Sequence, residues 1–264
     1  MAKDNKSITL YAKEEQHINA AIDKIVVELF NKWGNDTSGQ AIVMTGCSPV
    51  VGTTSTSIEL GIAIASSKRK TLLIDCDVRK AIKYKKLNEK ASKGLADYLL
   101  DEEVELEDVL YDTNIENLQY IPCGDYSENP TRVLCSVRVE ELVAEVKDQY
   151  DCILFDVPAV TIVPDAQVLF PYADGIILLA ALGETRKKQI KEAKRKVSPF
   201  ADKYYGMIVN KIPMDVYKQN VKDHDYYFVD KKGEQSFYKN EGYKKYTKKR
   251  KAVSVKKEVT NNEE

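Results

Sequence analysis

Six short, apolar, strand-like segments constrain the fold of this chain more than any other feature. They lie at residues 41–46, 71–75, 118–124, 151–156, 175–182 and 205–212. The segments between them carry apolar residues at helical spacing. Apolar strands that alternate with amphipathic helices are typical of a parallel sheet with helices on both faces. The sequence therefore predicts an α/β protein with a doubly wound parallel sheet, a Rossmann-like three-layer sandwich.

The expected helices and the change of composition near Pro213 divide the chain into three parts. The longer helices are expected at 18–33, 54–67, 130–149 and from residue 185 onward. Residues 1–15 are polar, and we expect them to be loose. After Pro213 no further strand is expected, and the chain becomes rich in Lys, Asp, Glu, Asn and Tyr. We therefore expect an N-terminal segment with an amphipathic helix (1–38), a core (39–213) and a polar Tyr/Lys-rich tail (214–264).

Composition and cysteine use favour a cytoplasmic protein. The five cysteines contain no CxxC pair, which is typical of reduced, buried thiols. The N-terminus lacks the apolar core of a signal peptide. The longest apolar run, Ile176–Leu182, is far shorter than the roughly 20 residues of a membrane-spanning helix. The net charge of −1 gives no argument for nucleic acid as a partner.

The first predicted strand leads through a short loop directly into a helix. Such a loop gathers backbone N–H groups and the positive end of the helix dipole around one point, where a phosphate can bind. The phosphate-loop pattern G-x-x-x-x-G-K-[ST] is met at Gly52 and Thr54, whereas Cys47 takes its first position and Thr53 its lysine position. An ordinary βα turn without a ligand remains an alternative. The candidate nucleotide-binding residues here are Ser48, Pro49, Val50, Val51, Gly52, Thr53, Thr54 and Ser55.

Carboxylates follow two further predicted strands. Asp75 and Asp77 end the second strand at positions i and i+2, so both are expected to point the same way. Asp156 ends the strand at 151–156, where a carboxylate is costly to bury unless it meets a cation or donors. The alternative is a set of solvated loop acids. Convergence of these strand ends beside the loop instead predicts a nucleotide site, in which the Thr54 hydroxyl and the pair Asp75 and Asp77 suit a hydrated Mg²⁺.

Three motifs over about residues 40–212 resemble those of the bacterial tyrosine kinases of capsular and exopolysaccharide synthesis. They are SPVVGTTS, LLIDCDVRK and YDCILFDVPAV, in the order of that CpsD/CapB type within the MinD/ParA-related P-loop superfamily. Asn129-Pro130, Asp165-Ala166 and the IVNK of 208–211 also look like family features. The resemblance implies an ATP- and Mg²⁺-dependent protein-tyrosine kinase.

Residue roles follow from the same resemblance. It implies that Asp75 and Asp77 contact Mg²⁺ and assist the incoming tyrosine hydroxyl, and that Asp156 holds Mg²⁺ through water. Asn210 lies where this fold usually contacts the base. The family lysine is replaced by Thr53, so the phosphate charge would need another cation, either Arg79 or a residue of a partner.

The N-terminal helix departs from the family as well. Family members carry an E-x-x-R-x-x-R pattern there for ring assembly, whereas residues 18–33 contain no arginine. Self-association therefore stays open. The resemblance also implies a membrane adaptor of the polysaccharide co-polymerase type as a partner.

The tail supplies candidate substrates. Six of the sixteen tyrosines lie beyond the core, and Tyr238, Tyr243 and Tyr246 are the candidates for autophosphorylation. Residues 241–257 hold eight Lys/Arg against one Glu, which favours peripheral contact with the anionic inner face of the plasma membrane. Two other functions remain open. One is a pseudokinase that acts as a regulatory partner, and the other is a positioning ATPase of the MinD/ParA type.

Overall fold

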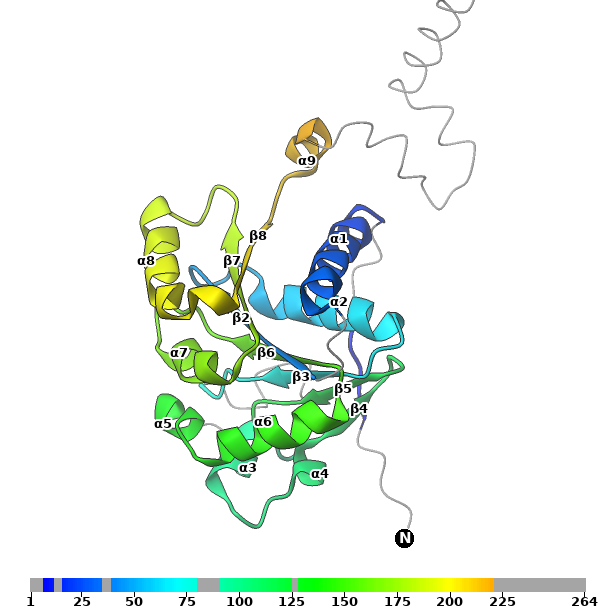
Figure 1. Ribbon diagram of the computed structural model, residues 1–264, viewed down its shortest axis with the longest axis vertical. Helices are drawn as coiled ribbons and strands as arrows, with labels where there is room; N and C mark the ends of the chain where they lie inside the picture. The colour runs from blue at the N-terminus through cyan, green and yellow to red at the C-terminus, as the bar shows by residue number, and fades with distance from the viewer. Residues whose placement is uncertain (1–6, 12–15, 35–38, 80–90, 125–127, 221–264) are drawn as a thin grey trace, which may run out of the picture. The chain divides into compact units, whose positions relative to one another are not determined.

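The computed structural model describes residues 7–11, 16–34, 39–79, 91–124 and 128–220. The chain forms two compact units. The first, Met1–Lys13 with Ala21–Lys211, holds the whole sheet and the helices that cover it (Figure 1). The second, Glu14–Ala20 with Ile212–Glu264, contains helix α9 (Met214–Asn220). The candidate site described below lies entirely within the first unit.

An eight-stranded sheet in the order β1-β4-β5-β3-β6-β2-β7-β8 forms the centre of the first unit. Only the β4–β5 pair is antiparallel, so the predicted parallel α/β sheet is confirmed as a mostly parallel one. All six predicted strands are present, and β1 and β4 are additional. The strands are β1 (Ser7–Ile8), β2 (Gln40–Gly46), β3 (Thr71–Asp75), β4 (Tyr111–Thr113), β5 (Leu118–Ile121), β6 (Cys152–Val157), β7 (Gly175–Ala181) and β8 (Tyr204–Asn210).

Helices connect the strands. The prediction of a single helix at 130–149 is wrong. Residues 135–137 divide it into two helices, α5 (Pro130–Leu134) and α6 (Arg138–Gln149). Ser136 explains the break, since its Oγ accepts the backbone N–H of Arg138 and donates to the carbonyl of Leu99. The helices of the first unit are α1 (Gln16–Trp33, from Ala21 onward), α2 (Thr53–Ser66), α3 (Leu95–Leu100), α4 (Leu106–Val109), α5 (Pro130–Leu134), α6 (Arg138–Gln149), α7 (Asp165–Leu169), α8 (Lys187–Val197) and the 3-10 turns Phe170–Tyr172 and Ser198–Lys203.

The strands bury both of their faces. Alternate residues such as Val43 and Phe155 form one core cluster with apolar side chains of α6, α7 and α8. On the opposite face, Gly61 of α2 lies against Leu154 of β6 and Leu118 of β5. Every residue of β2, β3, β6 and β7 is buried, which explains why these strands read as continuous apolar runs.

The expectation of a loose N-terminus is wrong for residues 7–11. Ile8 and Leu10 are 2% and 1% exposed, and β1 pairs with β4 in parallel. The Asn114 side chain accepts the Leu10 N–H at 2.7 Å and donates to the Leu10 carbonyl at 3.1 Å. Two apolar residues in a polar stretch are too short a pattern to show a strand. The rest of 1–15 lies outside the described residues.

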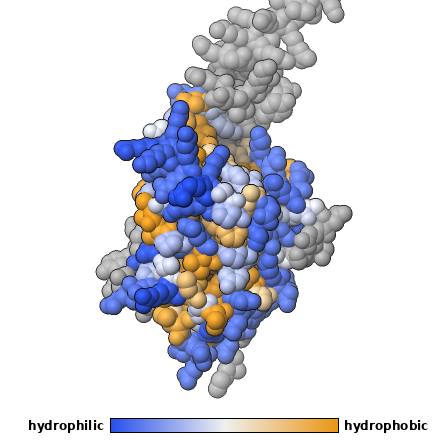
Figure 2. Space-filling model, turned by 60° about the vertical axis from the view of Figure 1, so that its left-hand side comes forward, coloured by the Kyte–Doolittle hydropathy of each residue, from blue (hydrophilic) through white to orange (hydrophobic). Residues whose placement is uncertain are grey.

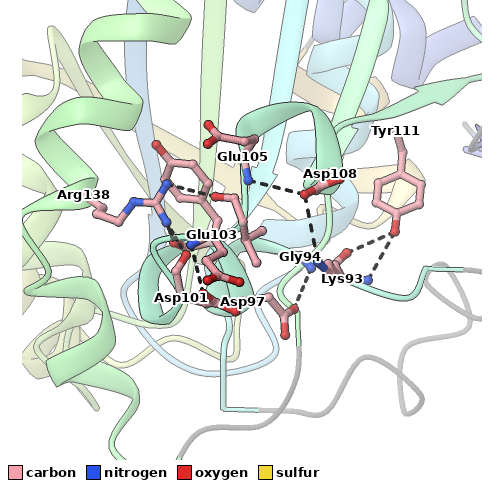
Figure 3. Close-up of polar contacts among 11 residues, drawn as sticks. Lys93, Gly94, Asp97, Asp101, Glu103, Glu105, Asp108, Tyr111 and Arg138 are labelled. Carbon is pink, nitrogen blue, oxygen red and sulfur yellow. Dashed lines mark hydrogen bonds and ion pairs between the residues drawn. The ribbon is translucent and has the colours of Figure 1, made fainter.

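Arg138 at the start of α6 holds the segment between α3 and α4 in place (Figure 3). Its guanidinium donates to the backbone carbonyls of Tyr98, Asp101 and Val104. The same group stacks over the Tyr98 ring, with Cζ 3.9 Å from the ring centroid. One planar cation thus donates to three backbone carbonyls between Tyr98 and Val104 and fixes the path of the chain there.

Four of the five cysteines are buried, as the sequence predicts, and the expectation is wrong for Cys135. Cys47, Cys76, Cys123 and Cys152 are buried free thiols, and Cys135 is exposed. No described helix combines the length and the apolarity needed to cross a membrane.

Candidate nucleotide site

The strand order brings the predicted site residues to one edge of the sheet. β3, β6 and β2 are consecutive neighbours, and all three run in parallel. Asp156 of β6 is in register with Asp75 of β3 on one side and with Met44 of β2 on the other. Because parallel strands end at the same edge, the loop after β2 lies beside both carboxylate-bearing strand ends.

The loop between β2 and α2 has the backbone of an anion-binding turn. Val50 and Gly52 both take left-handed conformations, with φ of 60° and 89°. A left-handed conformation in a β-branched residue costs about 1–2 kcal/mol, and such strain is typical of functional loops. No side chain caps α2 after Gly52, so the N–H groups of its first turn point toward the loop without a side-chain acceptor. This arrangement fits a phosphate.

Neighbouring strands and loops fix the start of the loop. The Cys47 N–H donates to the Leu179 carbonyl at 2.7 Å, and Thr161 Oγ1 donates to the Cys47 carbonyl at 3.0 Å. Ser48 Oγ lies 3.0 Å from Thr185 Oγ1. The loop is therefore held in shape by protein contacts alone, as a preformed binding site requires.

Burial also keeps the loop free of negative charge. Cys47 is fully buried, and this burial raises the pKa of its thiol to about 11, although nearby Lys194 lowers it slightly. At neutral pH the thiol is therefore protonated. It does not repel a phosphate held by the adjacent N–H groups.

We expect Gly52→Ala to destabilise the protein by about 1–3 kcal/mol. The alanine would have to adopt the left-handed φ of Gly52, and its Cβ would lie 2.4 Å from Asn210 Nδ2. Gly183→Ala is the matched control, because Gly183 has a φ of 76° but no atom within 4 Å of the place that a Cβ would take. Urea unfolding of both variants measures the difference. Equal losses would show that the loop shifts away from Asn210 at no cost.

The two carboxylates after β3 play different structural roles. Asp75 is 2% exposed; its Oδ1 accepts the Asp77 N–H at 3.0 Å, and its Oδ2 accepts the Tyr120 hydroxyl at 3.3 Å. Asp77 is half-buried. Asp156 is 4% exposed, with Ser57 Oγ 3.4 Å from its Oδ1. Asp75 thus shapes the turn that carries Asp77.

A cavity of about 630 Å³ lies in front of the loop. Its size is within the usual range of small-molecule sites. Asp75, Val51 and Asn210 are outside its lining, and the Asn210 side chain instead donates to the Val51 carbonyl at 2.9 Å. The lining residues are Ser48, Pro49, Val50, Gly52, Thr53, Thr54, Ser55, Asp77, Arg79, Asp156, Val157, Pro158, Ala159, Ile162, Val163 and Lys211.

Arg79 lines this cavity but is engaged by a buried partner. Its Nε and Nη2 donate to the two carboxylate oxygens of Asp165 at 2.9 and 2.7 Å. Asp165 is 0% exposed, and Thr131 Oγ1 donates to the same carboxylate at 2.7 Å. The sequence suggests Arg79 as a phosphate ligand, whereas the structure shows it tying α5 and α7 to the loop after β3.

The carboxylates fit Mg²⁺ only together with a phosphate. Within the described residues, no group of three or more His, Cys, Asp or Glu side chains could hold a metal ion. Mg²⁺ is usually bound through one or two carboxylates, several waters and substrate phosphates. Asp77, Asp156 and Thr54 around one cavity meet that requirement.

Lys211 is a charged cavity residue that has no site role among the sequence predictions. It follows β8, a strand that is separated from β2 by β7, and in the sequence it stands out only as part of the IVNK segment. A lysine directly after a strand whose end faces the loop was the available signal. Tyr238, Tyr243 and Tyr246 lie outside the described residues.

Comparison with known proteins gives consistent results. The profile of the AAA domain family matches residues 40–183. Tyrosine-protein kinase CpsD of Streptococcus pneumoniae serotype 4 is 32% identical over 218 residues, which cover 82% of this chain and 92% of that protein. The kinase domain of VpsO is 29% identical with a TM-score of 0.65, over 75% of this chain and 96% of that domain. MinD of Pyrococcus horikoshii is 22% identical with a TM-score of 0.53, over 69% and 76% of the two chains, and this likeness shows the fold alone.

Proposed function

Because this chain belongs to the CpsD-like family of bacterial tyrosine-protein kinases of capsule and exopolysaccharide synthesis, we propose that its cavity binds ATP with Mg²⁺ for phosphoryl transfer to tyrosine. The family itself implies nucleotide binding. One observation carries the proposal. The uncapped N-terminus of α2 and the carboxylates of Asp77 and Asp156 meet at a single cavity.

Each residue of the cavity has a role in this proposal. The N–H groups of Gly52–Ser55 bind the phosphates, and Asn210 holds the loop carbonyl at Val51. Thr54, Asp77 and Asp156 would hold Mg²⁺, which would neutralise charge on the phosphates. Asp77, which lines the cavity, is the proposed acceptor of the proton of the tyrosine hydroxyl. Asp75 positions Asp77 through its backbone N–H.

The tyrosines of the tail are the proposed substrates. Tyr238, Tyr243 and Tyr246 are on the same chain as the cavity, and this tethering gives them an effective concentration in the millimolar range. Transfer in the cell would involve a membrane adaptor of the polysaccharide co-polymerase type. This partner follows from the family resemblance.

A basic surface on α8 supports recruitment to the inner face of the plasma membrane. The hydrophilic region that faces the viewer in the upper part of Figure 2 lies over this helix. Clustered Lys and Arg are attracted to anionic lipids by up to about 1 kcal/mol each near the surface. The exposed basic side chains are Arg186, Lys187, Lys188, Lys191, Lys194 and Arg195.

The loss of the loop lysine favours a second candidate function, a pseudokinase that binds nucleotide and regulates a partner. Thr53 makes the loop a degenerate form of the phosphate-loop motif, since a hydroxyl supplies one hydrogen bond and no charge. Removal of one well-placed transition-state donor lowers a rate on the order of 10²–10³-fold. Incubation with labelled ATP and Mg²⁺, followed by phosphotyrosine detection, separates this candidate from an active kinase.

We expect Thr53→Lys to strengthen ATP binding by about tenfold or more, because a charged donor contributes about 1.5–3 kcal/mol. Calorimetry with ATP and Mg²⁺ measures the change. Asn31→Lys, at an exposed site of α1 outside the cavity lining, controls for the added charge. A Thr53→Lys variant that folds and binds ATP no better than the unaltered protein would show that a cation at this position of the loop does not reach the phosphates, and would contradict this expectation.

A further inference from the structure

The cavity contains a cation that can replace the missing loop lysine. Among the residues that the structure describes, two basic ones line it, Arg79 and Lys211. They differ in how firmly the protein already holds them. This difference decides which of the two is available to a ligand.

Arg79 is held by an ion pair with a buried carboxylate. Both oxygens of the fully buried Asp165 accept hydrogen bonds from it, and Thr131 completes the cluster. A move toward a phosphate would leave a buried carboxylate without its cation, which costs several kcal/mol. Arg79 therefore stays with Asp165.

Lys211 is held beside the loop through its backbone. Its φ of 56° is left-handed, which is uncommon for a residue other than glycine. The Asn210 side chain stabilises this conformation, because its Oδ1 accepts the Lys211 N–H at 2.7 Å while its Nδ2 donates to the Val51 carbonyl at 2.9 Å. One amide thus couples the position of Lys211 to the loop.

The ammonium group of Lys211 forms an exposed ion pair that a stronger ligand can replace. Its Nζ lies 2.7 Å from Glu184 Oε2, and the two side chains are 35% and 57% exposed. An ion pair this exposed contributes roughly 0–1 kcal/mol. A phosphate group with two or more negative charges offers a stronger partner than a single hydrated carboxylate.

We propose that Lys211 is the phosphate-binding cation of this site, in place of the lysine that Thr53 lacks. Glu184 is its partner in the absence of nucleotide and releases it when phosphates bind. The inference rests on the proposed function, since it assigns a ligand to the same cavity. It makes Lys211 a binding residue and Glu184 a residue that opposes binding.

The test is calorimetry with ATP and Mg²⁺ on three single variants. Lys211→Met should weaken binding on the order of tenfold to a hundredfold. Glu184→Gln should strengthen it by a few-fold. Lys24→Met, an exposed lysine of α1 outside the cavity lining, should bind as the unaltered protein does. Thermal unfolding without nucleotide should be nearly the same for all three, because exposed residues contribute little to stability.

A double variant shows whether Glu184 acts through Lys211. In Lys211→Met, Glu184→Gln the gain from Glu184→Gln should disappear, and Thr53→Lys added to Lys211→Met should restore affinity. Unaltered protein that binds no ATP would overturn the proposed function and this inference together. ATP binding that Lys211→Met leaves unchanged would overturn the inference alone.

Discussion

Protein isolated from its own host should carry phosphotyrosine after residue 213, concentrated at Tyr238, Tyr243 and Tyr246. The tail is the substrate most readily presented, and its neighbouring lysines stabilise the new charge. Three phosphates would add roughly five to six negative charges beside the basic run of 241–257. That change would offset most of the run's excess positive charge. Mass spectrometry of tail peptides measures the modification.

The double variant Asp75→Asn, Asp77→Asn should remove this phosphotyrosine. The two asparagines keep the shapes of the side chains but remove two negative charges. One is the charge of Asp77 in the cavity, and the other is that of Asp75, which accepts the Asp77 N–H and so positions it. We expect a fall of at least the order of 10²–10³ in the rate of transfer. Glu102→Gln, Glu103→Gln is the matched control, because both residues are exposed and lie outside the cavity lining. A tail that stays unmodified with the adaptor present, or a modification that survives the Asp variants, would favour the pseudokinase.

Arg79→Met should lower the free energy of unfolding by about 3 kcal/mol. The variant leaves Asp165 fully buried without its cation, with Thr131 as the remaining donor of this cluster. For a protein of this size the loss corresponds to a fall in Tm of roughly 6–12 °C. Differential scanning calorimetry without nucleotide measures it.

Two further variants separate the ion pair from a general effect of losing an arginine. Arg132→Met removes an exposed arginine of the adjacent α5 and should change Tm little. The double variant Arg79→Met, Asp165→Asn should be less destabilised than the sum of its single variants, because neither charge is then left alone. An Arg79→Met variant that is as stable as the unaltered protein but has lost ATP binding would contradict this assignment and would show that Arg79 is a phosphate ligand.

Strands that are buried on both faces could be predicted from sequence because burial leaves a continuous apolar run. The residues 41–46, 71–75 and 151–156 showed this pattern, and β2, β3 and β6 occur within a residue of those limits. β1 and β4 were missed, since each is only two or three residues long and lies toward one side of the sheet. Their strand conformation comes from pairing, of β1 with β4 and of β4 with β5.

Helix boundaries depended on particular side-chain contacts. The spacing of apolar residues across 130–149 does not distinguish one continuous helix from two consecutive helices. Ser136 decides between them by accepting the Arg138 N–H, and Arg138 then reaches the carbonyls after α3. Contacts between segments some 37 residues apart leave no periodic signal in the chain.

The sequence alone determined the order of strand, loop and helix, and the carboxylates that follow two buried strands. These features are local, because they depend on the burial and the backbone preferences of neighbouring residues. Only the tertiary structure decided which charged side chains the cavity can use. The ion pair with Asp165 holds Arg79, so that Arg79 is not available to a phosphate. The pairing of β7 with β8 brings Lys211 to the loop. Such choices arise from residues more than 80 positions apart that meet only when the sheet has formed.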